Sequence, residues 1–161
     1  MSEKETQKVI ELFKKYNIQH TLVTHNATLT SQDSARERGG LLSQGVKSML
    51  VKTRDAPVKY LIANIPADKK LDFKKLEQFS GFQNLTMASP AEVLEQTGCE
   101  LGAVPPLGHK NQLPLAADLK LFENEMNEFN IGQRTVSAKV PTHELKRLFQ
   151  ELNIRQGNIT Q

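Results

Sequence analysis

The sequence predicts one α+β domain, in which a mixed, mostly antiparallel and barrel-like β-sheet is surrounded by helices. Several short apolar segments have the length and composition of strands, and four or five segments with helical periodicity lie between them. These segments do not alternate as in a regular strand–helix–strand fold, and the sequence contains no internal repeat. A chain of 161 residues is long enough to bury one core of ordinary size. We therefore expect a single domain over residues 1–153, followed by a frayed polar tail over residues 154–161.

Capping residues and apolar spacing predict the first elements. Ser2 and Glu5 have the spacing of a capping box, and apolar residues then recur on one helical face, which predicts a helix over residues 3–16. Residues 20–24 alternate enough for a short strand. A second helix is expected from Thr30-Ser31-Gln32-Asp33 to Gly39-Gly40, because hydroxyl and carboxylate side chains cap helix starts and glycine commonly ends helices.

A hairpin is predicted in the centre of the chain. Residues 46–53 and 58–65 are apolar runs of strand length, joined by the short segment Arg54-Asp55-Ala56-Pro57. The two-residue period of the first strand places Lys47 on the same face as Met49 and Val51. A lysine among apolar neighbours either extends its amine into solvent at a strand edge or holds a positive charge in a pocket, and the pattern alone leaves both alternatives open.

The second half of the chain contains further helices and strands. Asp72 can cap a helix that ends at Gly81, and Ser89-Pro90-Ala91-Glu92 begins a stronger helix that ends at Gly98. Strands are expected over residues 113–121, 127–131 and 135–140. The last helix starts near Thr142, and the apolar side chains that it is expected to bury are Leu145, Leu148, Phe149 and Leu152.

The segment from Thr97 to His109, called here the Gly-Pro loop, can be neither an ordinary helix nor a central strand. Its three glycines permit positive φ angles or close approach of the backbone to a ligand, and its two successive prolines fix φ and carry no N–H. A loop with these restrictions is rigid. It can offer the backbone groups of Gly102, Ala103 and Val104 to a small ligand, and a purely structural turn is the alternative.

Within this loop, Gly102 to Pro106 resembles the Gly-x-x-x-Pro loop of the YbaK/prolyl-tRNA synthetase editing-domain family, whose members hydrolyse mischarged aminoacyl-tRNA. The resemblance covers most of the chain. Its further segments, in the family's order, are Thr24-His25, Gly45 to Leu50, Tyr60 to Asn64 and Phe129 to Gly132. It implies the same α+β architecture.

The resemblance also implies roles for individual residues. Lys47 would hold the phosphate or ribose of the 3′-terminal nucleotide and orient the ester, and the backbone N–H of Gly102 or Ala103 would stabilise the oxyanion that forms during hydrolysis. Lys47 and Gly102 are therefore the candidate catalytic residues. The substrate-binding residues that the resemblance implies are His25, Ala103, Val104, Pro106, Asn130 and Gly132. Some relatives carry other residues at the positions of Asn130 and Ser137, so the amino acid that is recognised stays open, and Ser137 is interpreted as an ordinary strand residue.

The sequence shows no evident protein base for the attacking water. His25 is either such a base or a loop histidine with satisfied hydrogen bonds, and in related proteins the 2′-hydroxyl of the terminal adenosine helps to position the water. Cys99 would be a nucleophile only with an adjacent histidine and an oxyanion site, and nothing in the sequence places them there. The other three histidines, His20, His109 and His143, are expected at the surface.

Composition restricts the function classes. The 21 basic and 18 acidic residues give a net charge of +3, which permits contact with nucleic acid without demanding it. Aromatic residues make up 6% and tryptophan is absent, which argues against a platform that stacks several bases. No apolar run approaches eighteen residues, and the charged N-terminus leads into no signal-peptide core, so we expect a cytoplasmic protein without a membrane partner. One cysteine and four scattered histidines give no zinc-ligand spacing, so no metal or cofactor is expected.

The family resemblance, with which the composition agrees, implies a freestanding, trans-editing aminoacyl-tRNA deacylase. It would bind the 3′ acceptor end of mischarged tRNA, with tRNAPro-type substrates, and an aminoacyl-tRNA synthetase is a further candidate partner. The alternative is a non-catalytic tRNA- or synthetase-binding module of the same fold. A small-molecule esterase or nucleotide binder is disfavoured, because the sequence has neither a Gly-x-Ser-x-Gly elbow nor a phosphate-binding Gly-Lys-Ser/Thr loop. The tRNA that is recognised and the oligomeric state stay open.

Overall fold

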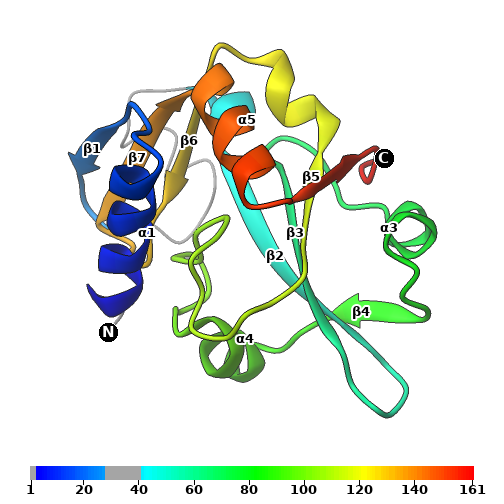
Figure 1. The fold of residues 1–161 in the computed structure, drawn as a ribbon. Helices are drawn as coiled ribbons and strands as arrows, with labels where there is room; N and C mark the ends of the chain where they lie inside the picture. The colour runs from blue at the N-terminus through cyan, green and yellow to red at the C-terminus, as the bar shows by residue number, and fades with distance from the viewer. Residues whose placement is uncertain (1–2, 28–40) are drawn as a thin grey trace.

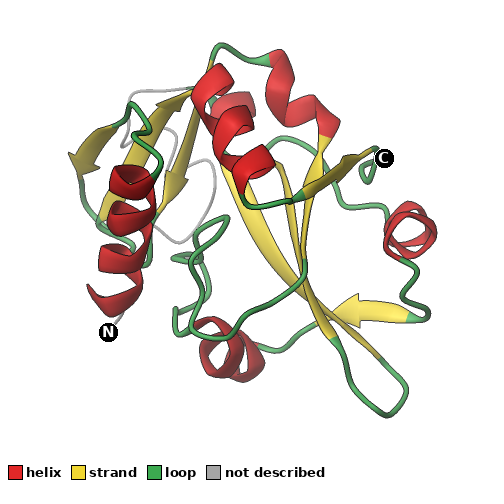
Figure 2. Cartoon of the chain, in the orientation of Figure 1, coloured by secondary structure: helices red, strands yellow, loops and turns green. Residues whose placement is uncertain are grey.

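The computed structural model describes residues 3–27 and 41–161, and their strands form two sheets (Figures 1 and 2). The three-stranded sheet is antiparallel and has the order β1 (Thr21–Thr24), β7 (Val136–Pro141), β6 (Met126–Asn130). The five-stranded sheet is mixed and has the order β4 (Leu85–Met87), β2 (Val46–Thr53), β3 (Tyr60–Pro66), β5 (Leu115–Asp118), β8 (Arg155–Gly157). In the second sheet β2 pairs antiparallel with β3 and β4, whereas β5 pairs parallel with β3 and β8.

The two sheets meet where β2 begins. Gly45, directly before β2, forms an isolated parallel bridge with Glu128 of β6. In the described chain the strands do not close into a barrel, because β1, β4 and β8 each pair with one neighbour only. The α+β class and the mixed, mostly antiparallel pairing are as the sequence predicts, and the barrel-like expectation is corrected to two sheets joined at a single bridge.

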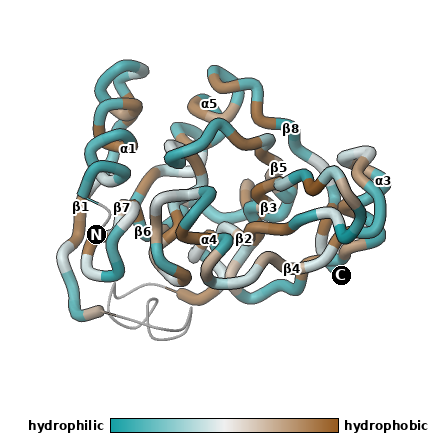
Figure 3. The backbone as a smooth tube through the Cα atoms, turned by 90° about the horizontal axis from the view of Figure 1, so that it is seen from below, coloured by the Kyte–Doolittle hydropathy of each residue, from teal (hydrophilic) through white to brown (hydrophobic). Residues whose placement is uncertain are grey.

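The described helices are α1 (Glu3–Lys15), α3 (Phe73–Ser80), α4 (Pro90–Thr97) and α5 (Thr142–Glu151), with short 3₁₀ helices over Leu42–Gln44 and Leu119–Glu123. Along α1, hydrophilic residues alternate with apolar ones at helical spacing (Figure 3). The predicted caps are present: Asp72 accepts a hydrogen bond from the N–H of Lys75, and Ser89 and Glu92 form a reciprocal capping box. The helix expected between Thr30 and Gly40 lies outside the described residues.

Buried apolar side chains form three clusters. The first joins α1 and α5 to the three-stranded sheet through residues such as Phe13, Phe129 and Phe149. The second lies between the five-stranded sheet and α3, and the third packs α4 and the Gly-Pro loop onto β2 and β3. Because alternate residues of a strand face opposite sides, Leu50 belongs to the third cluster and its neighbour Val51 to the second.

The C-terminal segment is part of the fold, so the expectation of a frayed tail after Asn153 is wrong. Residues 155–157 form β8, and Ile159 is fully buried. The buried carboxylate of Asp118 accepts hydrogen bonds from the N–H of Ile159 at 2.9 Å and from the hydroxyl of Thr160 at 3.3 Å. A polar strand of three residues has no periodicity that a sequence can reveal, and its stability comes from pairing with the distant strand β5.

Three further details differ from what the sequence predicts. The strand predicted over residues 113–121 is limited to β5, because Asp118 accepts a hydrogen bond from the N–H of Lys120 and starts a 3₁₀ helix. Strand β4 was not predicted, and its three residues pair with the end of β2. Leu152, expected in the core, is only half-buried.

Candidate functional site

The Gly-Pro loop starts where α4 ends and is packed against the core on one side. Gly98 ends the helix with a φ of 77°, in the left-handed region. Ala103 and Val104 are buried in the third cluster, beside Leu50 and Ile62 of the central strands. Gly102 is exposed and has a φ of 91°, a conformation that glycine adopts without strain. The loop is therefore a fixed surface with one exposed edge at Gly102.

Hydrogen-bond donors, most of them from other parts of the chain, hold the loop by its carbonyl groups. Leu101 O accepts from Arg134 at 3.0 Å, and Ala103 O accepts from the N–H of Gly132 at 2.9 Å. The carbonyl of Gly102 accepts from the side-chain amide of Asn130. Further along, Pro106 O accepts from Asn64 at 3.0 Å, and Pro105 O is bonded to the ring of His109 at 2.7 Å.

This anchoring fixes the direction of the N–H groups. In a trans peptide the C=O and N–H point in opposite directions, so holding Leu101 O aims the N–H of Gly102 away from Arg134. In the same way, holding Ala103 O aims the N–H of Val104 away from Gly132. Within the part of the chain that the structure describes, neither N–H has a hydrogen-bond partner. Two fixed and unpaired donors two residues apart on one loop are suited to stabilising a developing oxyanion.

The N–H of Ala103 is not such a donor. It donates to the carbonyl of Glu100 at 2.9 Å, which closes a tight turn at the start of the loop. The expectation that Ala103 would offer its N–H to a ligand is therefore wrong, and the free donors are those of Gly102 and Val104. The sequence could not show this, because it depends on the turn geometry of the loop.

A chain of polar side chains connects the three-stranded sheet to the loop. His25, directly after β1, is bonded through Nε2 to the hydroxyl of Ser137 on β7 at 2.7 Å. The Ser137 hydroxyl is bonded to Oδ1 of Asn130 at 2.8 Å, and Asn130 in turn holds Gly102. His25 Nδ1 lies 2.8 Å from the carbonyl oxygen of Asn26. Both ring nitrogens of His25 are engaged, which matches the alternative of a histidine with satisfied hydrogen bonds.

A pocket of about 220 Å³ adjoins this arrangement. It lies between the start of the Gly-Pro loop and the turn from β6 to β7, and its lining residues are Ala27, Glu100, Ala103, Gly132, Gln133, Arg134 and Thr135. Gly132 has a φ of 107°, which lets the turn approach the loop closely. Arg134 spans the pocket edge, because its guanidinium reaches both Leu101 O and, at 3.6 Å, the carboxylate of Glu100.

Lys47 lies apart from the polar chain. Register pairs it with Ile65 on β3, and alternation places its side chain on the face of Met49 and Val51. The neighbouring Ser48 faces the loop instead, because its hydroxyl donates to Asn64 at 2.6 Å. Lys47 is half-buried, and burial lowers the pKa of its amine below the usual value, an effect that Lys70 increases and Asp68 opposes. In the described residues its amine has no hydrogen bond or ion pair.

Of the predicted site residues, the structure brings His25, Gly102, Ala103, Asn130 and Gly132 together. Val104 and Pro106 belong to the same loop but are buried. Residues that sequence reasoning did not select are Ser137, Arg134 and Asn64. Arg134 and Asn64 contact the loop directly, and Ser137 is linked to it through Asn130. A polar residue within the apolar run of β3 was a signal that could have identified Asn64.

The expectation of a surface position is wrong for His109. It is 8% exposed, and burial, the main cause, lowers the pKa of its ring to about 4. Its ring is therefore neutral near pH 7, and its bond to Pro105 O stabilises the loop from within. His143 is exposed as expected, whereas His20 is half-buried with its ring centroid 4.4 Å from that of Phe13.

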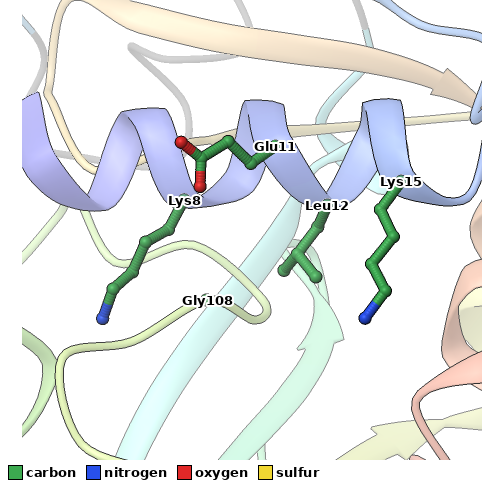
Figure 4. Close-up of a pocket in the computed structure, with 5 residues that line it drawn as sticks. All are labelled: Lys8, Glu11, Leu12, Lys15 and Gly108. Atoms are coloured by element: carbon green, nitrogen blue, oxygen red, sulfur yellow. The ribbon is translucent and has the colours of Figure 1, made fainter.

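Helix α1 packs against the far end of the loop. A pocket there is lined by Lys8, Glu11, Leu12, Lys15 and Gly108 (Figure 4). Figure 4 shows the two lysines extending on either side of Leu12. Lys8 donates from Nζ to the carbonyl of His109 at 3.2 Å, and a Cβ at Gly108 would lie 3.2 Å from a methyl group of Val9. The contacts at this end therefore position the loop and leave little room for larger residues.

Residues 3–27 and 41–161 contain neither a metal-binding cluster nor a membrane-spanning helix. No group of three or more histidine, cysteine, aspartate or glutamate side chains in this part could hold a metal ion. None of its helices is long and apolar enough to cross a bilayer.

Two curated relatives align over most of this chain. The Multifunctional Ser/Thr-tRNA deacylase ProXp-y of Escherichia coli (strain K12) is 34% identical over 146 residues, which is 89% of this chain and 87% of the relative. The Proline–tRNA ligase of Thermosipho melanesiensis is 29% identical over 140 residues, which is 87% of this chain but only 24% of the ligase.

Two solved structures share the fold. The hypothetical protein APE2540 superposes with a TM-score of 0.84 at 23% identity, covering 96% of this chain and 99% of that protein. A candidate trans-editing enzyme for prolyl tRNA synthetase superposes with a TM-score of 0.78 at 22% identity, covering 100% and 99%. Residues 25–148 match the model of the family described as the aminoacyl-tRNA editing domain. This match spans well over half of the sequence and includes the whole Gly-Pro loop, so the chain belongs to the aminoacyl-tRNA editing domain family.

Proposed function

We propose that this protein is an aminoacyl-tRNA deacylase that acts in trans and hydrolyses the ester between a mischarged amino acid and the 3′-terminal adenosine of tRNA. The observation that carries the proposal is the pair of unpaired N–H groups, of Gly102 and Val104, on a loop whose carbonyl groups from Leu101 to Ala103 are held by donors elsewhere in the chain. Such a pair can bind the carbonyl oxygen as it becomes an oxyanion. A cytoplasmic location, where charged tRNA is used, is part of the proposal.

The reaction needs few protein groups. The oxygen of a water molecule bonds to the ester carbonyl carbon, and the oxyanion of the tetrahedral intermediate is held by the two N–H groups. The bond from this carbon to the 3′ oxygen then breaks, and the proton from water passes to that oxygen, which leaves a free amino acid and tRNA. No side chain in the described residues is placed as a free base next to these donors, so we propose that the substrate's 2′-hydroxyl positions the water.

Lys47 is assigned to the nucleic-acid side of the substrate. As the resemblance implies, its compact ammonium would hold the phosphate or ribose of the terminal nucleotide. The side chain lies on the opposite face of β2 from Ser48, which faces the loop, so this role is supported by the resemblance and not by proximity to the loop. Its half-buried position supports this role, because a charge that is partly removed from water gains more from an anionic partner than an exposed one does. His25, Asn130 and Gly132 would shape the aminoacyl side of the site.

The substrates that we propose are tRNAs, with tRNAPro among them, that carry a small amino acid such as serine or threonine. The pocket beside the loop, at about 220 Å³, suits a small side chain better than an aromatic one. The name of the Escherichia coli relative supports serine and threonine, and the match to part of a proline–tRNA ligase supports tRNAPro and a synthetase as a partner.

The test is a deacylation panel. tRNAPro charged with proline, alanine, serine, threonine or phenylalanine is incubated with the protein, and the remaining ester is followed over time against a protein-free blank. Faster hydrolysis of the seryl or threonyl ester than of the prolyl ester supports the proposal. Binding of these tRNAs without any accelerated hydrolysis would instead identify a non-catalytic tRNA-binding module.

A further inference from the structure

We infer that Ser137 is a positioning residue of the reaction, acting through Asn130 on the peptide group between Gly102 and Ala103. The inference rests on the proposed function, and it assigns a role to a side chain that the strand pattern alone gives no reason to select. The argument depends on which atoms donate and which accept along the polar chain from His25 to the loop.

The Gly102 carbonyl fixes the orientation of the Asn130 amide. A carbonyl oxygen can only accept, so the atom of Asn130 that faces it is Nδ2. The other end of the amide, Oδ1, can also only accept, and it lies 2.8 Å from the hydroxyl of Ser137. The single proton of the Ser137 hydroxyl is therefore donated to Asn130. Without this bond the amide could rotate and release the carbonyl.

The same reasoning assigns the bonds of His25. Because the hydroxyl proton of Ser137 is used, its oxygen must accept from His25 Nε2 at 2.7 Å. The carbonyl oxygen of Asn26 lies 2.8 Å from Nδ1, and it accepts a hydrogen bond there only when the ring carries a proton on both nitrogens. Every bond thus runs in one direction, from the imidazole ring through the hydroxyl and the amide to the loop. Bonds arranged in this way polarise one another, so each supports the next.

The peptide group between Gly102 and Ala103, where this series of hydrogen bonds ends, is held on both sides. Its oxygen, from Gly102, is held by Asn130, and its N–H, from Ala103, is held by Glu100 O at 2.9 Å. The two free N–H groups belong to the peptide units directly before and after it. Rotation of the central peptide would change the angle between these donors, and glycine at position 102 has the conformational freedom to allow it.

Strand pairing makes the arrangement rigid. Asn130 and Ser137 are directly opposite each other in the register of β6 and β7, and Ser137 is likewise opposite Val23 of β1. Ser137 is fully buried, so water cannot replace it as a donor to Asn130 without rearrangement of the sheet. Through Asn130, the hydroxyl therefore fixes the loop relative to the three-stranded sheet.

Alanine variants of the three residues in the polar chain from His25 to the loop should show a graded loss of kcat. Asn130→Ala should reduce kcat most, Ser137→Ala by roughly threefold to tenfold, and His25→Ala least, because each residue is one bond further from Gly102. KM should change less than kcat, since the three residues act mainly on the peptide that orients the two N–H donors and none of them holds the nucleotide. Ser137→Thr, which keeps the hydroxyl, should recover most of the activity.

Double variants test whether Ser137 acts through Asn130. The variant N130A/S137A should be no slower than N130A alone, because removing Asn130 already disconnects Ser137 from the loop. Independent and multiplicative losses would overturn the inference. A largest loss for His25→Ala would also overturn it, since it would identify the ring as the base and not as the start of a positioning chain.

A second amide–hydroxyl pair on the same strand serves as the control. Asn127 of β6 donates to the hydroxyl of Thr142 at 2.9 Å, away from the loop. Thr142→Val should lower thermal stability but leave kcat unchanged. A loss of kcat equal to that of Ser137→Ala would show that any destabilisation of β6 slows the enzyme, and the inference would fail.

An NMR measurement separates this inference from the proposed function. In ¹⁵N-labelled protein, Ser137→Ala should shift the backbone amide resonances of Gly102, Ala103 and Val104, and Thr142→Val should not. If the parent protein hydrolyses no aminoacyl-tRNA but these shifts occur, the proposed reaction is wrong and the positioning of the loop by Ser137 stands. If the parent is active and the resonances do not move, the inference is overturned.

Discussion

The N–H of Gly132 donates to the carbonyl of Ala103 at 2.9 Å, so one of the bonds by which the turn after β6 holds the Gly-Pro loop joins backbone to backbone. A bond between two backbones does not depend on side-chain rotamers, and it therefore fixes the loop more firmly than a side-chain contact does. Hydrolysis should therefore be sensitive to the backbone conformation at Gly102, the exposed residue at the edge of the loop.

Gly102→Val should abolish deacylation while leaving a folded protein. A side chain at a φ of 91° costs about 1–2 kcal/mol, and relief of that strain would turn the free N–H away from its present direction. Loss of one oxyanion donor typically reduces kcat by roughly a hundredfold or more. The measurement is kcat on a seryl- or threonyl-tRNA substrate, beside thermal unfolding.

Gly81→Val is the matched control for this change. Gly81 follows α3, has a φ of 82°, and has no atom within 4 Å of the position that a Cβ would take. It should show a similar loss of stability with unchanged kcat. An active Gly102→Val variant would disprove the role of the loop, and outright unfolding of Gly102→Val beside a folded Gly81→Val would show that the loop is structural first.

Lys47→Ala should be the most damaging side-chain change that leaves the protein stable. Removing a charge-assisted hydrogen bond costs about 1.5–3 kcal/mol, or roughly tenfold to a hundredfold in rate. Lys47→Arg should restore only part of the activity, because a planar guanidinium does not replace a compact ammonium in a confined site. Lys74→Ala, at an exposed position of α3, is the control that should remain fully active, as should Cys99→Ala.

The pH profile gives an independent check on Lys47. Burial lowers the pKa of its amine, so the charge is lost at a lower pH than in a free lysine. If the charged form holds the substrate, protein-dependent hydrolysis should fall as the pH rises through that lowered pKa, after subtraction of spontaneous hydrolysis. Lys47→Arg should not show this fall, because arginine stays charged. Identical pH profiles for the parent protein and Lys47→Arg would show that loss of the Lys47 charge does not limit hydrolysis.

The parts of the fold that the sequence predicted are those with local causes. The caps at Asp72, Ser89 and Gly98 follow from residues within one helical turn, and the hairpin of β2 and β3 from two long apolar runs. Strands β4 and β8 were missed because three residues carry no period, and they are stable only through pairing with strands elsewhere.

The residues of the candidate site divide in the same way, into those that the sequence can indicate and those that depend on distant contacts. The resemblance selected Gly102 and Asn130 as residues of one loop and one neighbouring strand, and the structure joins them by a hydrogen bond. It could not indicate that Ala103 N–H is used within its own turn, or that His109 is buried, since both depend on how the loop closes on itself. The placement of Lys47 on the other face of β2 follows from alternation, which the sequence did predict.

Glu92 should stabilise the protein in a pH-dependent way. Its carboxylate accepts hydrogen bonds from the N–H of Ser89, from Lys52 at 2.9 Å and from Tyr60 at 2.8 Å, and these, in that order of effect, lower its pKa to about 2. A lowered pKa means that the stabilisation is present above the normal value of 4.5 and is lost as the pH falls from there towards 2. Glu92→Gln should therefore lower the free energy of unfolding by about 1–2 kcal/mol at pH 7 and by almost nothing near pH 2. Urea unfolding at the two pH values makes the comparison, and an equal difference at both would contradict it.

Ile159→Ala should destabilise the protein strongly, although the residue is third from the C-terminal end. Its side chain is fully buried in the cluster under α3, and its N–H is held by the buried carboxylate of Asp118 at 2.9 Å. Truncating a buried isoleucine to alanine removes apolar contacts and leaves a cavity, at a cost of about 2–5 kcal/mol. Asn158→Ala, at the exposed neighbouring position, should change the free energy of unfolding by less than about 0.5 kcal/mol. Urea unfolding of both variants is the measurement. If Ile159→Ala were as stable as Asn158→Ala, the last residues would contribute nothing to the core, and β8 would be a strand that forms without stabilising the sheet it joins.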